Sequence, residues 1–143
     1  MEDYFESALF GTPFTSAVIV AAGSSQRMGG EDKQLIKLCG KPVLARSMAA
    51  FQSCPVIEEI VVVTKASSVE AVRRMAEEYG IDKLSAVVEG GASRAESVKN
   101  GVAAVSSGAE FVAIHDGARP LVSSEDIARC AADAFRCGGA VLA

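Results

Sequence analysis

The stretch Ser16-Ala-Val-Ile-Val-Ala-Ala22 decides the fold, because it is a short, continuous apolar run that stops at Gly23. A strand that is apolar on both sides is typical of a parallel sheet whose two faces are covered by helices. Further runs of this kind follow along the chain, separated by segments with helical periodicity. This alternation predicts an α/β fold with three layers, α/β/α, that is Rossmann-like and has a mostly parallel sheet.

The limits of the expected elements follow from these runs and from the glycines and prolines between them. The strands are expected at Ser16–Ala22, Ile60–Thr64, Ser85–Glu89 and Phe111–His115, and a fifth is expected to begin at Ala140–Ala143. The helices are expected at Pro42–Ser53, Ser67–Tyr79, Arg94–Val105 and Ser124–Cys137. Residues 1–15 are expected to form a loosely ordered lead-in, and residues 16–143 a single domain.

The composition limits the classes of function. The chain has 143 residues, of which 50% are hydrophobic, and a formal net charge of −4. These values are typical of one globular domain and argue against broad electrostatic binding to nucleic acid or to a membrane. No apolar run approaches the roughly 18 residues of a membrane span, and the acidic start lacks the basic region of a secretory signal. A cytoplasmic location is therefore expected.

The four cysteines favour the same location. Cys39, Cys54, Cys130 and Cys137 form no C-x-x-C pair. On a helix, Cys130 and Cys137 would lie about 10 Å apart, which is too far for a disulfide. Reduced thiols are therefore expected. A zinc site is not expected, because His115 is the only histidine that could help to form one.

The first polar motif, Ala21-Ala-Gly-Ser-Ser-Gln-Arg-Met-Gly-Gly-Glu-Asp-Lys33, follows the first strand. Glycines let a backbone approach a ligand, and successive N–H groups in such a turn can bind phosphate oxygens. Arg27 and Lys33 would add the positive charge that a triphosphate needs. The motif is not G-x-G-x-x-G, and Gly40-Lys41 is followed by Pro42, which excludes a P-loop. The alternative is a solvated loop with two ordinary surface cations.

The second motif, Gly90-Gly-Ala-Ser-Arg-Ala-Glu-Ser97, joins the third strand to a helix. Ser93 and Glu96 fit a capping box, which explains those two residues by structure alone. A cation is disfavoured at a helix N-terminus, so Arg94 indicates an anionic or polar ligand nearby. Ser97 lies one turn further along the same side of the helix. The alternative for Ser97 is an ordinary exposed serine.

The third motif, His115-Asp-Gly-Ala-Arg-Pro120, follows the fourth strand. Mg²⁺ is bound by one or two carboxylates together with substrate phosphates, and Asp116 fits that task. The alternative for Asp116 is a cap of the following turn. His115 is expected to be a packed strand residue. Arg119 could hold a second anionic substrate or form a salt bridge to Glu125 or Asp126.

In this order, the three motifs resemble those of the 2-C-methyl-D-erythritol 4-phosphate cytidylyltransferase family. The opening A-A-G-x-x-x-R-M is shared with sugar-nucleotide and molybdopterin nucleotidyltransferases, whereas Gly90–Val98 and His115–Pro120 are more specific. The resemblance covers Ser16 to Ala143. It implies a nucleotidyltransferase fold with a nucleotide-binding domain over residues 16–143. It also implies an Mg²⁺-dependent transfer of CMP from CTP to methylerythritol phosphate, with release of pyrophosphate.

The resemblance further implies roles for individual residues. Arg27 and Lys33 would be catalytic, and Asp116 would bind both the nucleotide and Mg²⁺. Arg119 would face the second substrate. The other nucleotide-binding residues would be Ala21, Ala22, Gly23, Ser24, Ser25, Gly91, Arg94, Ser97 and Gly117.

Two features depart from the family pattern. Ala92 stands where the family often has an acid, so one contact to the base would be missing. The chain also stops at Ala143, before the segments that would complete the acceptor site and a dimerising arm. We therefore expect a fragment of a longer, homodimeric enzyme, or a chain completed by another one, with little turnover of its own. The apolar end at Ala140–Ala143 would leave an unpaired sheet edge, so association is also expected.

Two other functions stay open on the residues alone. The run Gly29-Gly-Glu-Asp-Lys33 also suits a molybdopterin-type nucleotidyltransferase that uses GTP or CTP. The other alternative is a nucleotide-binding fragment without catalytic activity.

Overall fold

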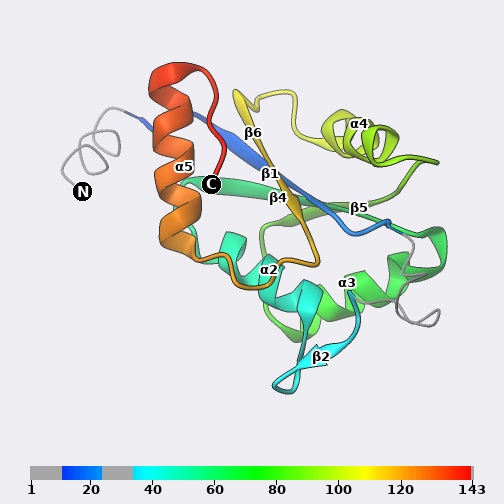
Figure 1. Cartoon of the computed structure of the whole chain (residues 1–143). Coiled ribbons are helices and arrows are strands. Elements are labelled where there is room, and N and C mark those ends of the chain that lie inside the picture. Colours follow the sequence, from blue (N-terminus) through cyan, green and yellow to red (C-terminus); the bar gives the residue numbers. More distant parts are fainter. Residues whose placement is uncertain (1–10, 24–33, 143) are drawn as a thin grey trace.

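The centre of the molecule is a four-stranded parallel sheet (Figure 1). It is seen in a computed structural model that describes residues 11–23 and 34–142. The strands are β1 (Thr15–Val20), β4 (Ile57–Thr64), β5 (Leu84–Glu89) and β6 (Phe111–Asp116), in the order β5-β4-β1-β6. Strand β1 lies inside the sheet and is buried along its whole length. This is the position that its continuous apolar run predicts.

Helices cover both faces of the sheet, which confirms the three-layer prediction (Figure 1). On one face, three helices pack on Ala17 and Ile19 of β1. On the other face, one helix of the described part of the chain packs over Val18 and Val20. The first three are α2 (Val43–Gln52), α3 (Val69–Glu78), which follows the 3-10 turn η2 (Ala66–Ser68), and α5 (Ser124–Cys137); the helix on the other face is α4 (Arg94–Ala104).

Helix α4 lies very close to the sheet at Gly101. A Cβ atom at this position would stand 2.4 Å from Cγ1 of Val18 and 2.8 Å from Cγ2 of Val63. A side chain here would push the helix away from the sheet, because such contacts are far below van der Waals distance. The close packing fixes the position of α4 relative to β1 and β4.

Two parts of the predicted architecture need correction. The expected fifth strand at Ala140–Ala143 is wrong, because residues 138–142 form no strand and Val141 is 92% exposed. So few residues offer too few ladder bonds and too little burial to offset the entropy of ordering them. A small antiparallel pair, β2 (Lys37–Leu38) with β3 (Lys41–Pro42), was not predicted. The other elements lie close to their expected limits.

The cysteines are free, as expected, and Cys54 is buried. Burial raises the pKa of the Cys54 thiol above its ordinary value of about 9.0. Over residues 11–23 and 34–142, the structure contains no helix with the length and apolar character that crossing a bilayer requires.

Candidate active site

The first and third motifs meet at the edge where the parallel strands end. Val20, the last residue of β1, is in register with Val63 of β4 on one side and with Asp116 of β6 on the other. The N–H of Ala21 donates to the carbonyl of Val63 at 2.7 Å, and the N–H of Gly117 donates to that of Val20 at 2.9 Å. This is the edge at which open α/β sheets bind their ligands.

The second motif reaches the same edge through Gly90. Its N–H donates to the carbonyl of Thr64 at 2.9 Å. A Cβ atom on Gly90 would stand 2.3 Å from Cβ of Ala22 and 2.8 Å from Oγ of Ser97. The β5–α4 loop therefore lies directly against the backbone that follows β1, and no side chain fits between them.

The first turn of α4 holds this loop by three hydrogen bonds. The hydroxyl of Ser93 accepts from the N–H of Glu96 at 3.1 Å, which confirms the predicted cap. The Glu96 carboxylate does not close the box on the cap residue, because it accepts instead from the N–H of Ala92 at 2.7 Å. The hydroxyl of Ser97 accepts from the N–H of Gly91 at 3.1 Å.

Ser97 is not the ordinary exposed serine of the alternative interpretation. Its exposed fraction is 3%, and it lies against both Gly90 and Gly91. Because its oxygen accepts from Gly91, its single hydroxyl proton is the group that it can offer to another partner. The sequence pattern therefore identified a residue that forms part of the loop rather than of the solvated surface.

Asp116 shapes the loop that follows β6. Its Oδ1 accepts from the N–H of Ala118 at 3.0 Å, and its backbone carbonyl accepts from the N–H of Arg119 at 3.1 Å. Asp116 thus caps the turn, as the structural alternative suggested. The turn uses one carboxylate oxygen, and a carboxylate has a second oxygen with which it can ligate a cation.

Ser47 of α2 also holds the β6–α5 loop in place. This buried hydroxyl donates to the carbonyl of Gly117 at 2.9 Å. The ring of His115 packs on Phe51, with 5.2 Å between the ring centroids, and its Nε2 bonds to the carbonyl of Arg119 at 3.0 Å. The interpretation of His115 as a packed strand residue is therefore confirmed.

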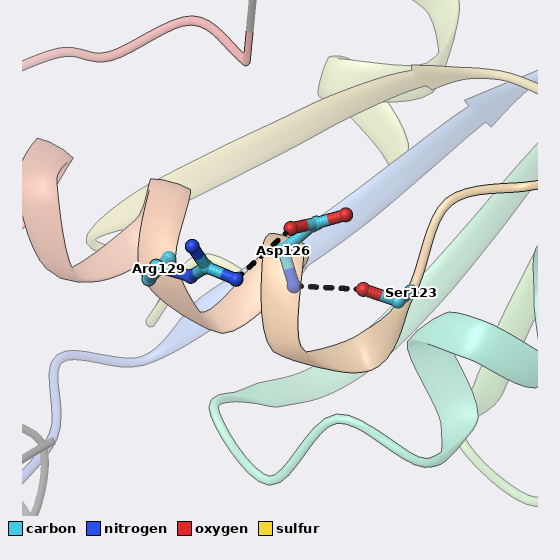
Figure 2. A network of polar contacts seen from close by, with 3 residues as sticks. All are labelled: Ser123, Asp126 and Arg129. Atoms are coloured by element: carbon cyan, nitrogen blue, oxygen red, sulfur yellow. Dashed lines mark hydrogen bonds and ion pairs between the residues drawn. The ribbon is translucent and has the colours of Figure 1, made fainter.

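Two cationic side chains stand exposed near this edge. Arg94 is the first residue of α4, and Arg119 lies in the β6–α5 loop. Among the residues that the structure describes, Arg119 forms no ion pair with Glu125. Asp126 is instead paired with Arg129 at 3.3 Å (Figure 2). The salt-bridge alternative for Arg119 is therefore wrong.

Asp116 suits a magnesium ion whose other ligands come from a substrate. Within the described part of the chain, no group of three His, Cys, Asp or Glu side chains could hold a metal by itself. Mg²⁺ is ordinarily bound by one or two carboxylates with water and substrate phosphates. A single carboxylate at the ligand edge of the sheet matches that requirement.

Four of the predicted site residues lie outside the described residues: Ser24, Ser25, Arg27 and Lys33. Two positioning residues were missed. Ser47 gives no sequence signal, because it sits 70 positions from the carbonyl that it contacts. Glu96 was recognised as a helix cap, but not as the acceptor of a hydrogen bond from the N–H of Ala92. A separate hollow of about 370 Å³ between α3 and β5, lined by residues such as Arg73 and Val87, contains none of the candidate residues.

The comparisons with known proteins agree on one family. Residues 15–143 match the family model described as 2-C-methyl-D-erythritol 4-phosphate cytidylyltransferase. The protein of that name from Dehalococcoides mccartyi strain 195 is 42% identical over 127 residues, which cover 89% of this chain and 56% of that protein. The one from Alkaliphilus oremlandii is 45% identical over 115 residues, covering 79% and 49%.

The similarity extends to solved structures. The 4-diphosphocytidyl-2C-methyl-D-erythritol synthase of Anaerococcus prevotii superposes with a TM-score of 0.76 at 30% identity, over 91% of this chain and 54% of that one. The chain thus spans about half the length of the curated relatives that it matches.

Proposed function

The chain belongs to the 2-C-methyl-D-erythritol 4-phosphate cytidylyltransferase family, and on this premise we propose that it provides the nucleotide-binding part of such an enzyme. The proposed reaction transfers the cytidylyl group of CTP to methylerythritol phosphate and releases pyrophosphate. The observation that carries the proposal is the meeting of three motifs at one sheet edge. Ala22 lies against Gly90, and Val20 is in register with Asp116.

The chemistry asks little of the protein beyond position and charge. A phosphate oxygen of the acceptor attacks the α-phosphorus in line and forms a new P–O bond. The bond from the α-phosphorus to the bridging oxygen breaks, and pyrophosphate leaves with that electron pair. The attacking phosphate is already ionised, so no general base is needed. We assign Arg27 and Lys33 to stabilise the charge on the reacting phosphorus and the leaving pyrophosphate.

The nucleotide would lie along the strand ends, with its base on the α4 side. We assign the backbone of residues 21–25 to wrap the nucleotide, and Gly91, Arg94 and Ser97 to the base. Gly117 would line the ribose, and exposed Arg119 would face the second substrate. Because β5 and β6 are separated by β4 and β1, these groups are spread over about 14 Å, which leaves room for a base at one end and phosphates at the other.

Asp116 would hold Mg²⁺ at the phosphate end of the site. When bound, the ion would neutralise negative charge on the triphosphate. The capped turn of Asp116 keeps its carboxylate in place, since Oδ1 is fixed by the N–H of Ala118. The protein therefore provides a preformed carboxylate, and the substrate completes the set of ligands.

Calorimetric titration of CTP into the chain in the presence of Mg²⁺ tests the proposal. We expect saturable binding of CTP and none of GTP, a result that would separate this function from a GTP-dependent nucleotidyltransferase. The variant Asp116→Asn keeps the cap oxygen but loses the charge, so it should weaken Mg²⁺-dependent CTP binding at least about tenfold. Asp82→Asn, at an exposed position away from this edge, is the matched control. Absence of CTP binding by the unmodified chain would refute the proposal.

A further inference from the structure

In the β5–α4 loop, the backbone N–H groups of residues 90–92 already donate hydrogen bonds within the protein. The N–H of Gly90 donates to the carbonyl of Thr64 at 2.9 Å. The N–H of Gly91 donates to Ser97 at 3.1 Å, and that of Ala92 donates to Glu96 at 2.7 Å. Through residues 90–92, the backbone can therefore offer a ligand only carbonyl oxygens, which accept hydrogen bonds.

The contact of Glu96 with Ala92 is not needed to begin the helix. Helix α5 begins with the same spacing, because Ser123 accepts from the N–H of Asp126 at 3.1 Å (Figure 2). Its acid, however, turns along the helix to Arg129 and does not reach back to the preceding loop. Glu96 and Asp126 thus occupy the same position after an equivalent cap, yet only Glu96 occupies a loop donor at the candidate site.

We propose that Glu96 is a positioning residue that makes this site prefer an aminopyrimidine nucleotide over an oxopyrimidine one, by occupying the N–H of Ala92. At the ring position where the two bases differ, cytosine carries an amino group that donates, whereas uracil carries an oxygen that accepts. The backbone of residues 90–92 presents only acceptors, and this favours the amino group. The side-chain donors of Arg94 and Ser97 are the same whether or not Glu96 occupies the N–H of Ala92. Release of the Ala92 N–H would give uracil a donor. This inference rests on the proposed function, since it concerns the base of the same nucleotide.

The test compares dissociation constants for CTP and UTP, measured with Mg²⁺ on the full chain. The unmodified chain should prefer CTP, and Glu96→Ala should reduce the CTP-to-UTP preference about tenfold or more. Glu96→Gln should retain most of it, because its amide oxygen can still accept from Ala92. Asp126→Ala removes the equivalent acid from α5 and should leave the ratio unchanged. An unchanged ratio in Glu96→Ala, or an equal loss in Asp126→Ala, would overturn the inference.

A second measurement covers the case in which Glu96→Ala alters folding. Hydrogen exchange at the Ala92 amide should become about tenfold faster in Glu96→Ala and recover in Glu96→Gln, while the amides of β1 keep their protection. An equal Ala92 rate in all three proteins overturns the inference. If the unmodified chain binds neither nucleotide, the proposed function fails and this inference fails with it. If it binds CTP selectively and Glu96→Ala does too, only the inference fails.

Discussion

The β5–α4 loop and the β6–α5 loop lie at the same sheet edge but are held in different ways. Residues 91–93 are tied by the first turn of their own helix, through partners three to six positions away. Residues 116–119 have a local cap from Asp116, but they also depend on distant partners, above all the buried hydroxyl of Ser47, 70 positions away. The first arrangement can be recognised in a short sequence motif. The second depends on the whole fold being formed.

Among the substitutions that test this difference between the loops, Gly90→Ala should have the largest effect on stability and on CTP binding. The new Cβ would stand 2.3 Å from Cβ of Ala22, so the loop must move away from β1. We expect a loss of about 1–3 kcal/mol in the free energy of unfolding and at least about tenfold weaker CTP binding. Denaturant titration and calorimetry measure the two effects.

The matched control is Gly117→Ala in the other loop. Its Cβ would meet nothing nearer than 3.0 Å, at the amide oxygen of Gln34, and a Leu44 methyl group at 3.1 Å. These two contacts are tighter than ordinary van der Waals contacts, but they involve side-chain ends that can shift, and the next atom, Cβ of Ala21, is at 3.3 Å. We therefore expect a smaller loss than for Gly90→Ala, about 1 kcal/mol or less. Equal losses in the free energy of unfolding for Gly90→Ala and Gly117→Ala would show that the two loops are packed equally closely.

The next effect should come from Ser47→Ala, which removes the distant partner of the β6–α5 loop. The buried carbonyl of Gly117 would lose its hydrogen bond, at a cost of about 1–3 kcal/mol. Ser53→Ala, at the exposed C-terminal end of the same helix, should change stability by less than about 0.5 kcal/mol. Thermal or denaturant unfolding distinguishes them. If the two variants are equally stable, the long-range contact contributes nothing.

A smaller loss, about 1 kcal/mol, is expected from Ser93→Ala, which removes the cap of α4. Ser123→Ala removes the equivalent cap of α5 and should cost a similar amount (Figure 2). Only the first substitution should alter CTP affinity, because only that cap borders the candidate site. A change in affinity with Ser123→Ala would contradict the local character of the first loop.

The smallest effect should be a pH dependence of the free energy of unfolding, which arises from Cys54 in the core beside α2. Burial raises the pKa of Cys54, so above about pH 9 the thiol ionises in the unfolded chain before it does in the folded one. The free energy of unfolding is therefore unaffected by ionisation of this thiol below about pH 9. Above pH 9 it declines, by at most about 1.4 kcal/mol per pH unit. Unfolding curves at several pH values measure the slope. Cys54→Ala should flatten it, and an identical slope in that variant would exclude Cys54 as the cause.

The parts of the fold that follow from local pattern could be predicted. The buried strands and the four longer helices were found, and α5 has the limits that were expected, Ser124–Cys137. The cap at Ser93 was also predicted, because it lies next to the start of its helix in the sequence. The equivalent cap at Ser123 was not predicted. Such signals work because they depend on residues within one turn of each other.

The parts that depend on tertiary contacts could not be predicted. The pair β2–β3 is only two residues long on each strand, below what periodicity can indicate. The fifth strand was inferred from an apolar run, but a strand also needs a bonded partner. The contact of Ser47 with Gly117 arises only when α2 packs under the end of β6. Among the described residues at the site, the sequence indicated that Gly91, Ser97 and Asp116 belong to loops at the same sheet edge, but not that Ser47 and Glu96 hold those loops in place.

The hydrogen bond between His115 and Arg119 fixes which nitrogen of the imidazole carries a proton. A carbonyl oxygen can only accept, so Nε2 must be the donor, and in the neutral ring the free lone pair lies on Nδ1. The one histidine of the chain therefore serves the turn beside Asp116 as a donor. A replacement without an N–H at that point would leave the carbonyl of Arg119 without this partner.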